Sequence, residues 1–160
     1  MKILKRLPPR NDYERSVLAN VEKFGWHCTS VFPKEGDDSP RFTYSVGLYH
    51  SYTQPEFIIF GLEGKIAHSL LNALAVAAAN GTMYPLDKPC NELIEGYDCA
   101  FVEVPRDRFN DYVFSALWFY ADVAFPLYQV VWPDAEGKFP WNSRYLDDPL
   151  YWQPVLGLRQ

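Results

Sequence analysis

The sequence is poor in the residues that cross-link small proteins or bind metals. It has three cysteines and three histidines among 160 residues. Cys28, Cys90 and Cys99 form no C-x-x-C pair, so neither a disulfide framework nor a zinc site is indicated, and a reducing compartment is favoured. Histidine pairs at metal-binding spacing and glycine-rich phosphate-binding motifs are missing as well. We therefore expect no metal and no cofactor.

A surplus of basic residues and a long apolar segment are also absent. Fifteen Lys and Arg stand against twenty Asp and Glu, and the resulting net charge of −5 argues against a nucleic-acid partner. The most apolar stretch, residues 66–79, is interrupted by His68 and Asn72 and is too short to span a bilayer. The basic N-terminus lacks the apolar run of a signal peptide. These absences predict a soluble, cytoplasmic protein without a membrane partner.

Aromatic residues, in contrast, are abundant: 11 Phe, 11 Tyr and 5 Trp. The length is that of one domain, and 48% hydrophobic residues suffice for a core. Apolar residues at helical spacing predict helices over residues 11–24, 64–80 and 107–122. Short β-rich runs predict strands over residues 26–32, 41–48, 56–61, 97–104 and 125–132. Because strands and helices do not alternate strictly, we expect a single α+β domain with a mostly antiparallel, five-stranded sheet and about three helices.

One set of polar residues is compatible with a pocket between the sheet and a helix. The set comprises Tyr44, Ser45, His50, Glu56 and His68. His50 follows a strand end, where loops often carry function, and either His50 or Glu56 would be the general base if the protein were an enzyme. The same pocket would suit a small-ligand sensor. Both interpretations require the five side chains to converge within hydrogen-bond reach.

Neither Ser45 nor Glu103 lies in a motif that is diagnostic of catalysis. Val46-Gly47 follows Ser45, which is not the G-x-S-x-G elbow of a hydrolase, so a serine facing the sheet is favoured. Glu103 shares a strand face with Phe101. That position fits both a buried acid with a raised pKa and a strand with one wet face. The sequence thus favours a non-catalytic protein.

The C-terminal segment carries the strongest indication of binding. Its aromatic residues alternate with prolines, and Trp and Tyr anchor interfaces because large rigid side chains lose little entropy on binding. The predicted partner-binding residues are the anchors Trp132, Trp141, Tyr145 and Trp152 and the charged rim Asp134, Asp147 and Asp148. The alternative is that this segment wraps on the protein's own sheet.

An ordered set of short phrases resembles one protein family. The phrases are GWH at 25–27, FTYSVGL at 42–48, PEFIIFGL at 55–62, LLN at 70–72, QVVWPD at 129–134 and GKFPW at 137–141. Together they resemble the bacterial family named domain of unknown function 4262. The resemblance spans about residues 24–142 and leaves an aromatic, proline-rich extension at 143–160 within a single domain, 1–160.

The resemblance implies a small soluble bacterial protein with no agreed reaction or cofactor. Some members of the family resemble immunity proteins encoded beside secreted toxins. Since the chain is acidic, a basic partner such as a nuclease toxin would complement its charge. We therefore predict a non-catalytic protein-binding module of immunity or antitoxin type, and we make no prediction of its oligomeric state.

Overall fold

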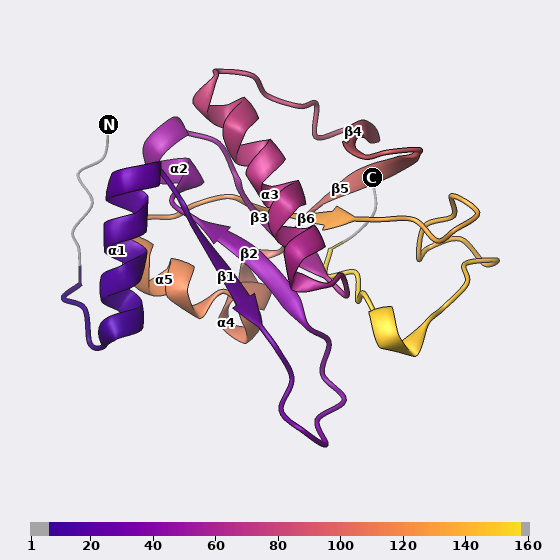
Figure 1. The fold of residues 1–160 in the computed structure, drawn as a ribbon, viewed down its shortest axis with the longest axis horizontal. Helices are drawn as coiled ribbons and strands as arrows, with labels where there is room; N and C mark the ends of the chain where they lie inside the picture. Colours follow the sequence, from indigo (N-terminus) through magenta and orange to yellow (C-terminus); the bar gives the residue numbers. More distant parts are fainter. Residues whose placement is uncertain (1–6, 158–160) are drawn as a thin grey trace.

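Six strands form one mixed sheet in the computed structural model, which describes residues 7–157. Their spatial order is β1-β2-β3-β6-β5-β4 (Figure 1). Neighbouring strands are antiparallel except at the centre, where β3 and β6 are parallel. The sheet therefore consists of two antiparallel meanders, β1-β2-β3 and β6-β5-β4, joined along β3 and β6. The strands are β1 (His27–Val31), β2 (Phe42–Val46), β3 (Glu56–Phe60), β4 (Cys90–Ile94), β5 (Tyr97–Glu103) and β6 (Leu127–Val131).

The predicted five-stranded, mostly antiparallel sheet is correct in its α+β class and wrong in two details. The sixth strand, β4, directly follows Pro89. The prolines of this segment indicate a loop, so the sequence does not predict the strand. The central pair is parallel, with Glu56 opposite Leu127 and Ile58 opposite Gln129. Strand direction depends on the long crossover between β3 and β6, and the residues of a strand do not encode it.

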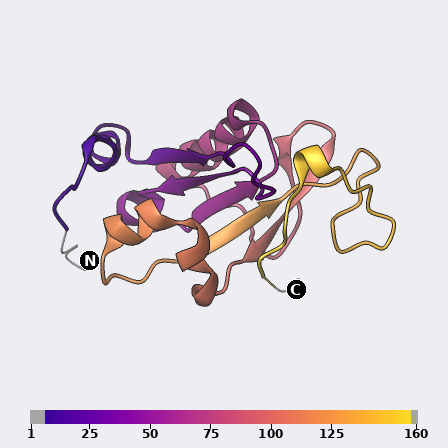
Figure 2. The same cartoon turned by 90° about the horizontal axis from the view of Figure 1, so that it is seen from below.

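Helices cover both faces of the sheet (Figure 2). One face packs against α1 (Asp12–Phe24), α4 (Phe109–Tyr112) and α5 (Phe114–Tyr120), with Val17 and Phe119 in its core. The other face packs against α3 (Gly64–Ala79), with Leu71 and Ile59 in its core. The sheet is thus the middle of three layers, and its central strands are covered on both sides.

The first helix follows from local signals. Asn11 caps α1 by accepting the backbone N–H of Glu14 at 2.8 Å. Gly25 ends the helix in a left-handed conformation, φ 88°, and donates its N–H to Val21 O at 2.9 Å. The helix predicted over residues 11–24 is confirmed for these reasons.

The helices predicted elsewhere need correction, because the described part of the chain has five α-helices rather than about three. The helix predicted over residues 107–122 is divided into a 3₁₀ turn, η1 (Arg106–Arg108), followed by α4 and α5, which Val113 separates with a non-helical ψ of 57°. The strand predicted over residues 41–48 stops at Val46 because Gly47 adopts φ 108°. The chain then turns directly into a short helix, α2 (Leu48–Tyr52).

Residues 143–157 pack on the same sheet. A 3₁₀ turn, η2 (Pro149–Tyr151), is followed by Gln153 and Leu156, both of which are buried. Leu156 belongs to the core on the side of α1 and α5. No helix within residues 7–157 is both long and apolar enough to cross a membrane.

Candidate functional site

The carboxyl group of Glu56 lies at the centre of the fold and has no exposed surface. Its Oε1 accepts hydrogen bonds from Ser45 Oγ at 2.7 Å and from Leu48 N at 3.2 Å. Its Oε2 accepts from the N–H groups of Gly47 at 3.0 Å and Tyr49 at 3.1 Å, and from the Tyr120 hydroxyl. Glu56 therefore caps the first turn of α2 and links it to β2 and β3.

Burial and hydrogen bonding act on the pKa of Glu56 in opposite directions. Burial in the core raises this pKa above its ordinary value of 4.5, and the hydrogen bonds from Tyr120, Ser45 and the backbone partly oppose the rise. Burial and the adjacent Glu56 also raise the pKa of the Tyr120 hydroxyl, which stays protonated and donates to the carboxyl group. Because the cluster is closed to solvent, it supports the structure and offers no surface to a substrate.

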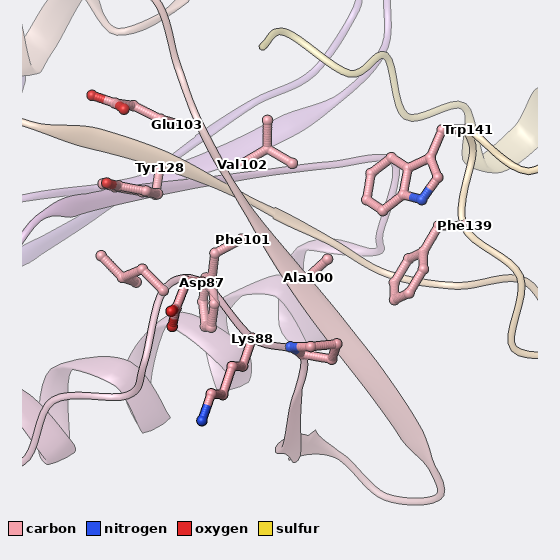
Figure 3. A pocket seen from close by; sticks show the side chains of 11 residues that line it. Asp87, Lys88, Ala100, Phe101, Val102, Glu103, Tyr128, Phe139 and Trp141 are labelled. Atoms are coloured by element: carbon pink, nitrogen blue, oxygen red, sulfur yellow. The ribbon is translucent and has the colours of Figure 1, made fainter. Parts of the chain in front are cut away.

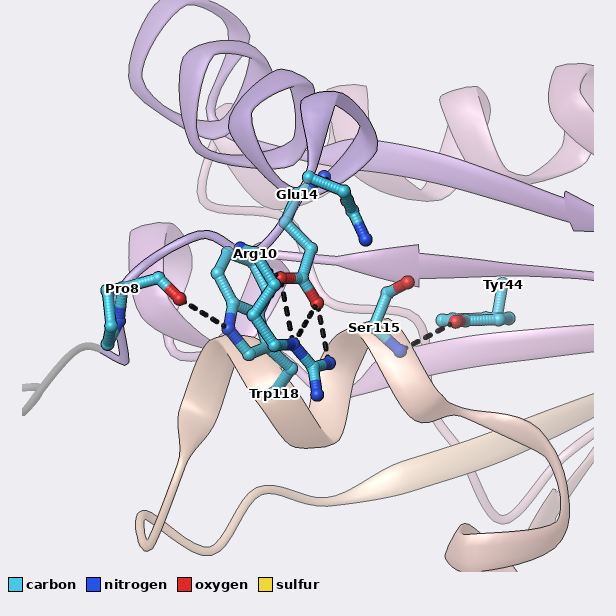
Figure 4. A network of polar contacts seen from close by, with 7 residues as sticks. Pro8, Arg10, Glu14, Tyr44, Ser115 and Trp118 are labelled. Atoms are coloured by element: carbon cyan, nitrogen blue, oxygen red, sulfur yellow. Dashed lines mark hydrogen bonds and ion pairs between the residues drawn. The ribbon is translucent and has the colours of Figure 1, made fainter.

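The other members of the predicted pocket lie in different places. Tyr44 is buried on the side of α5, where its hydroxyl accepts the N–H of Ser115 at 3.1 Å (Figure 4). His50 is exposed on α2 with its ring edge-on to Phe119, and exposed His68 lies on α3 against Trp26. The structure brings Ser45 and Glu56 together and leaves the other three apart from them. The five residues therefore do not form the shared pocket that the alternative prediction requires.

Trp132 and Tyr145 hold the C-terminal segment against the sheet. Trp132 is half-buried and donates its indole N–H to Phe60 O at 2.8 Å. Gln153 Nε2 donates to Trp132 O at 2.5 Å and to the Tyr145 hydroxyl at 3.1 Å. The alternative prediction of a segment wrapped on its own sheet describes these two anchors well.

Asp134 supports the same segment from within. It is buried, with Oδ1 accepting the N–H groups of Glu136 and Lys138 at 2.9 Å and Oδ2 accepting that of Leu146 at 2.9 Å. Desolvation opposes ionisation of Asp134, but the hydrogen bonds from Leu146, Lys138 and Glu136 prevail and lower its pKa. Its carboxylate therefore binds backbone N–H groups of the loop that it holds in place.

Replacing Asp134 with alanine is expected to loosen this loop, because three backbone N–H groups lose their acceptor. Amide hydrogen exchange at Leu146 should accelerate at least about tenfold. Since the folded pKa is lowered, the contribution of Asp134 is present above the unfolded pKa and is lost as the pH falls through the folded value. Asp147→Ala removes an exposed charge nearby and is the control. Unchanged exchange at Leu146 in the Asp134 variant would contradict this role.

The two remaining tryptophans of the predicted interface line different hollows. Trp141 stacks on Phe139, with ring centroids 4.9 Å apart, beside the edge of β5. Trp152 is 44% exposed and lines a groove that also includes Phe32 and Leu150. The predicted anchors thus divide into two internal ones, Trp132 and Tyr145, and two at separate surfaces.

The groove beside Trp152 combines apolar and acidic side chains. It has a volume of about 450 Å³, and two of its apolar side chains, Phe32 and Leu150, are 61% and 74% exposed. The loop after β1, which contributes Phe32, also contributes Asp37 and Asp38. Hydrogen bonds from Ser39 lower the pKa of Asp37, so this wall carries a fixed negative charge. We call this surface the acidic groove.

The structure adds members to the site that sequence reasoning did not select. Phe32 was predicted as the last residue of the first strand and Asp37 in the loop after it; both are more than a hundred residues from Trp152 in the sequence. Arg41 joins the two segments, since its guanidinium donates to Leu150 O at 3.3 Å and lies over the Tyr151 ring. The signal in the sequence was a Phe just before an acidic loop, and it did not indicate that Trp152 lies near. Asp147 and Asp148, predicted as part of a charged rim, are exposed just before η2.

Comparison with known proteins gives one result. The sequence model of a family described as "Domain of unknown function (DUF4262)" matches residues 20–146. No curated protein and no solved structure matches the chain. The match includes the strands, the Glu56 cluster and Asp134, and it ends before η2.

Proposed function

We propose that this chain, which belongs to the DUF4262 family, is a non-catalytic protein-binding module of immunity or antitoxin type. Its partner would be a basic protein that docks on the acidic groove. The observation that carries this proposal is the exposure of Phe32, Leu150 and Trp152 next to Asp37 and Asp38. Large apolar side chains surrounded by charge are typical of protein interfaces.

Charge supports a basic partner in particular. The chain has a net charge of −5, and Asp147 and Asp148 add exposed carboxylates beside the groove. Arg41, the basic residue in the groove, is already engaged with Leu150 O and the Tyr151 ring. A complementary positive surface would be steered towards this region and would bind faster at low salt. Occlusion of the active site of such a partner is how the module would neutralise a toxin.

Two phenylalanines of nearly equal exposure provide a matched test. Phe32 is 61% exposed in the acidic groove, and Phe114 is 64% exposed at the start of α5, outside it. In a pull-down from lysate of the native host, wild type and Phe114→Ser should capture the same basic protein. Phe32→Ser should bind it at least about tenfold more weakly, because it lacks the aromatic side chain that the partner would bury in the complex.

The captured protein must then show the toxic activity that the proposal assigns to it. Expressed alone it should arrest growth, and co-expression of the wild-type chain should restore growth where Phe32→Ser does not. An acidic or non-toxic partner would contradict the proposal. So would a partner that binds Phe32→Ser as tightly as wild type, or the absence of any stoichiometric partner.

A further inference from the structure

A proline interrupts the pairing between β4 and β5. The two strands pair at Cys90 with Cys99 and at Ile94 with Tyr97. Continued in the antiparallel direction, this register would set Pro89 opposite Ala100. Proline has no N–H to donate to a ladder and is confined to the ends and edges of sheets. The pairing therefore stops, and residues 86–89 diverge from the second half of β5.

The divergence leaves one edge of β5 open. Residues 100–103 pair with β6, from Ala100 opposite Val131 to Glu103 opposite Tyr128. Within residues 7–157 no strand pairs with them on the other side. An unpaired strand edge presents a row of main-chain donors and acceptors, which makes it a template for another strand.

A cleft of about 310 Å³ follows this open edge (Figure 3). Residues 100–103 form its floor, and residues 86–89 form one wall. The stacked rings of Phe139 and Trp141 form the opposite wall. The cleft therefore occupies the gap where the ladder between β4 and β5 would have continued.

The direction of the main-chain groups can be derived from one hydrogen bond. Val104 donates its N–H to Leu127 O at 2.9 Å, so its main chain points towards β6. Alternate residues of an antiparallel strand point in opposite directions, so the N–H and C=O groups of Phe101 and Glu103 point towards the cleft. Gly157 limits the cleft at one end, since a Cβ there would lie 2.0 Å from Glu103 O. Phe101 is thus the central position available for pairing.

The side chains of the cleft differ between its two ends. Phe139 and Trp141 offer an aromatic surface beside Ala100, while the Glu103 carboxylate and the Tyr128 hydroxyl lie together at the other end (Figure 3). The charge of Glu103 contributes to the raised pKa of Tyr128, after burial, which reflects their proximity. Asp87 adds a second carboxylate, and the Lys88 ammonium points away from Glu103. A guest with a positive charge and an apolar side chain would match both ends.

We propose that this cleft binds an extended segment of a partner protein, added as a strand to the open edge of β5. Adjacent side chains of an added strand point to opposite faces. An apolar side chain would rest on Phe139 and Trp141, and a Lys or Arg side chain three residues further along the segment would reach Glu103 from the opposite face. This site goes beyond the proposed function, because it is separate from the acidic groove and requires no toxin.

The test uses the peptide acetyl-(Lys-Leu)₃-amide with the full-length protein. Its binding should saturate below about 1 mM, change the fluorescence of Trp141 and slow amide exchange at Phe101. Glu103→Gln and Trp141→Ala should each weaken binding at least about fivefold. Phe32→Ser should leave it unchanged, which separates this site from the acidic groove. A peptide with Glu in place of Lys should not bind.

Two N-methylated peptides distinguish strand addition from adhesion by side chains. One carries N-methyl groups on its leucines and the other on its lysines, so the side chains remain the same. In an added strand only one of the two sets of N–H groups faces β5, so one peptide should lose binding and the other should retain it. Equal binding of both, equal loss of both, or binding that survives Glu103→Gln and Trp141→Ala would overturn the proposal.

Discussion

Replacing Glu56 with glutamine is expected to lower the free energy of unfolding by about 3 to 5 kcal/mol, since each buried donor left without an acceptor costs about 1 to 3 kcal/mol. Five hydrogen-bond donors converge on this carboxyl group, from Ser45, Tyr120 and the backbone of residues 47–49. A glutamine would place its own N–H₂ against at least two of these donors and leave them without an acceptor in a site that no water reaches. Urea unfolding of the variant and of wild type measures the difference.

Glu63→Gln is the matched control for this variant. Glu63 is exposed and lies just before α3, so its substitution should change the free energy of unfolding by no more than about 0.5 kcal/mol. An equally small effect for Glu56→Gln would show that the Glu56 cluster does not stabilise the fold.

The raised pKa of Glu56 also predicts that the free energy of unfolding depends on pH. Because the folded pKa of Glu56 is raised, the native state holds its proton at pH values where the unfolded chain has released it. The contribution of Glu56 to stability is therefore fully present below the unfolded pKa and declines as the pH rises through the folded value. The stability advantage of wild type over Glu56→Gln should shrink across that interval. An advantage that grows with pH would mean that the hydrogen bonds prevail over burial.

Gly61→Ala is expected to have the second largest effect, about 2 to 3 kcal/mol. Gly61 ends β3 with φ 81°, a conformation that costs a residue with a Cβ about 1 to 2 kcal/mol. A Cβ at this position would also lie 2.7 Å from Tyr151 O and 2.8 Å from Trp152 O. Since both neighbours are backbone atoms, η2 would have to move away from the sheet, and the acidic groove would change with it.

Gly137→Ala separates the conformational cost of the positive φ from the steric contact with residues 151–152. Gly137 has the same φ of 81°, but a Cβ there would meet nothing within 4 Å. Gly137→Ala should therefore show the conformational cost alone, and Gly61→Ala should be less stable by the contact with residues 151–152. Gly61→Ala should also weaken capture of the partner by the acidic groove, whereas Gly137→Ala should not. Identical unfolding curves for the two variants would show that the approach of η2 to β3 is unimportant.

Local signals account for the parts of the fold that the sequence predicts well. The cap at Asn11, the left-handed Gly25 and the apolar stripe of α3 all lie within or next to the helix that they specify. Most predicted strands need only small changes at their ends for the same reason. β4 was missed because it is only five residues long, contains Asn91 and Glu92, and directly follows a segment with Pro85 and Pro89.

Features that depend on distant pairs could not be predicted in the same way. The carboxyl group of Glu56 suggests a general base, but Tyr120, 64 residues away, helps to enclose it. Trp132 and Trp152 are the same residue type in the same aromatic segment, yet one bonds to Phe60 O and the other lines the acidic groove. Composition identifies the segment as important without indicating which ring faces inwards.

The parallel pairing of β3 with β6 sets the order in which the protein can assemble. The first meander is complete when the chain reaches Phe60, but the inner edge of β3 has no partner until Leu127–Val131 has been made. Residues that pair across this seam, such as Glu56 and Leu127, are far apart in the chain, and closing so long a loop slows folding. While the residues up to β6 are being synthesised, the inner edge of β3 therefore has no partner strand. The next element to emerge, α3, covers one face of this meander and leaves the edge of β3 for β6.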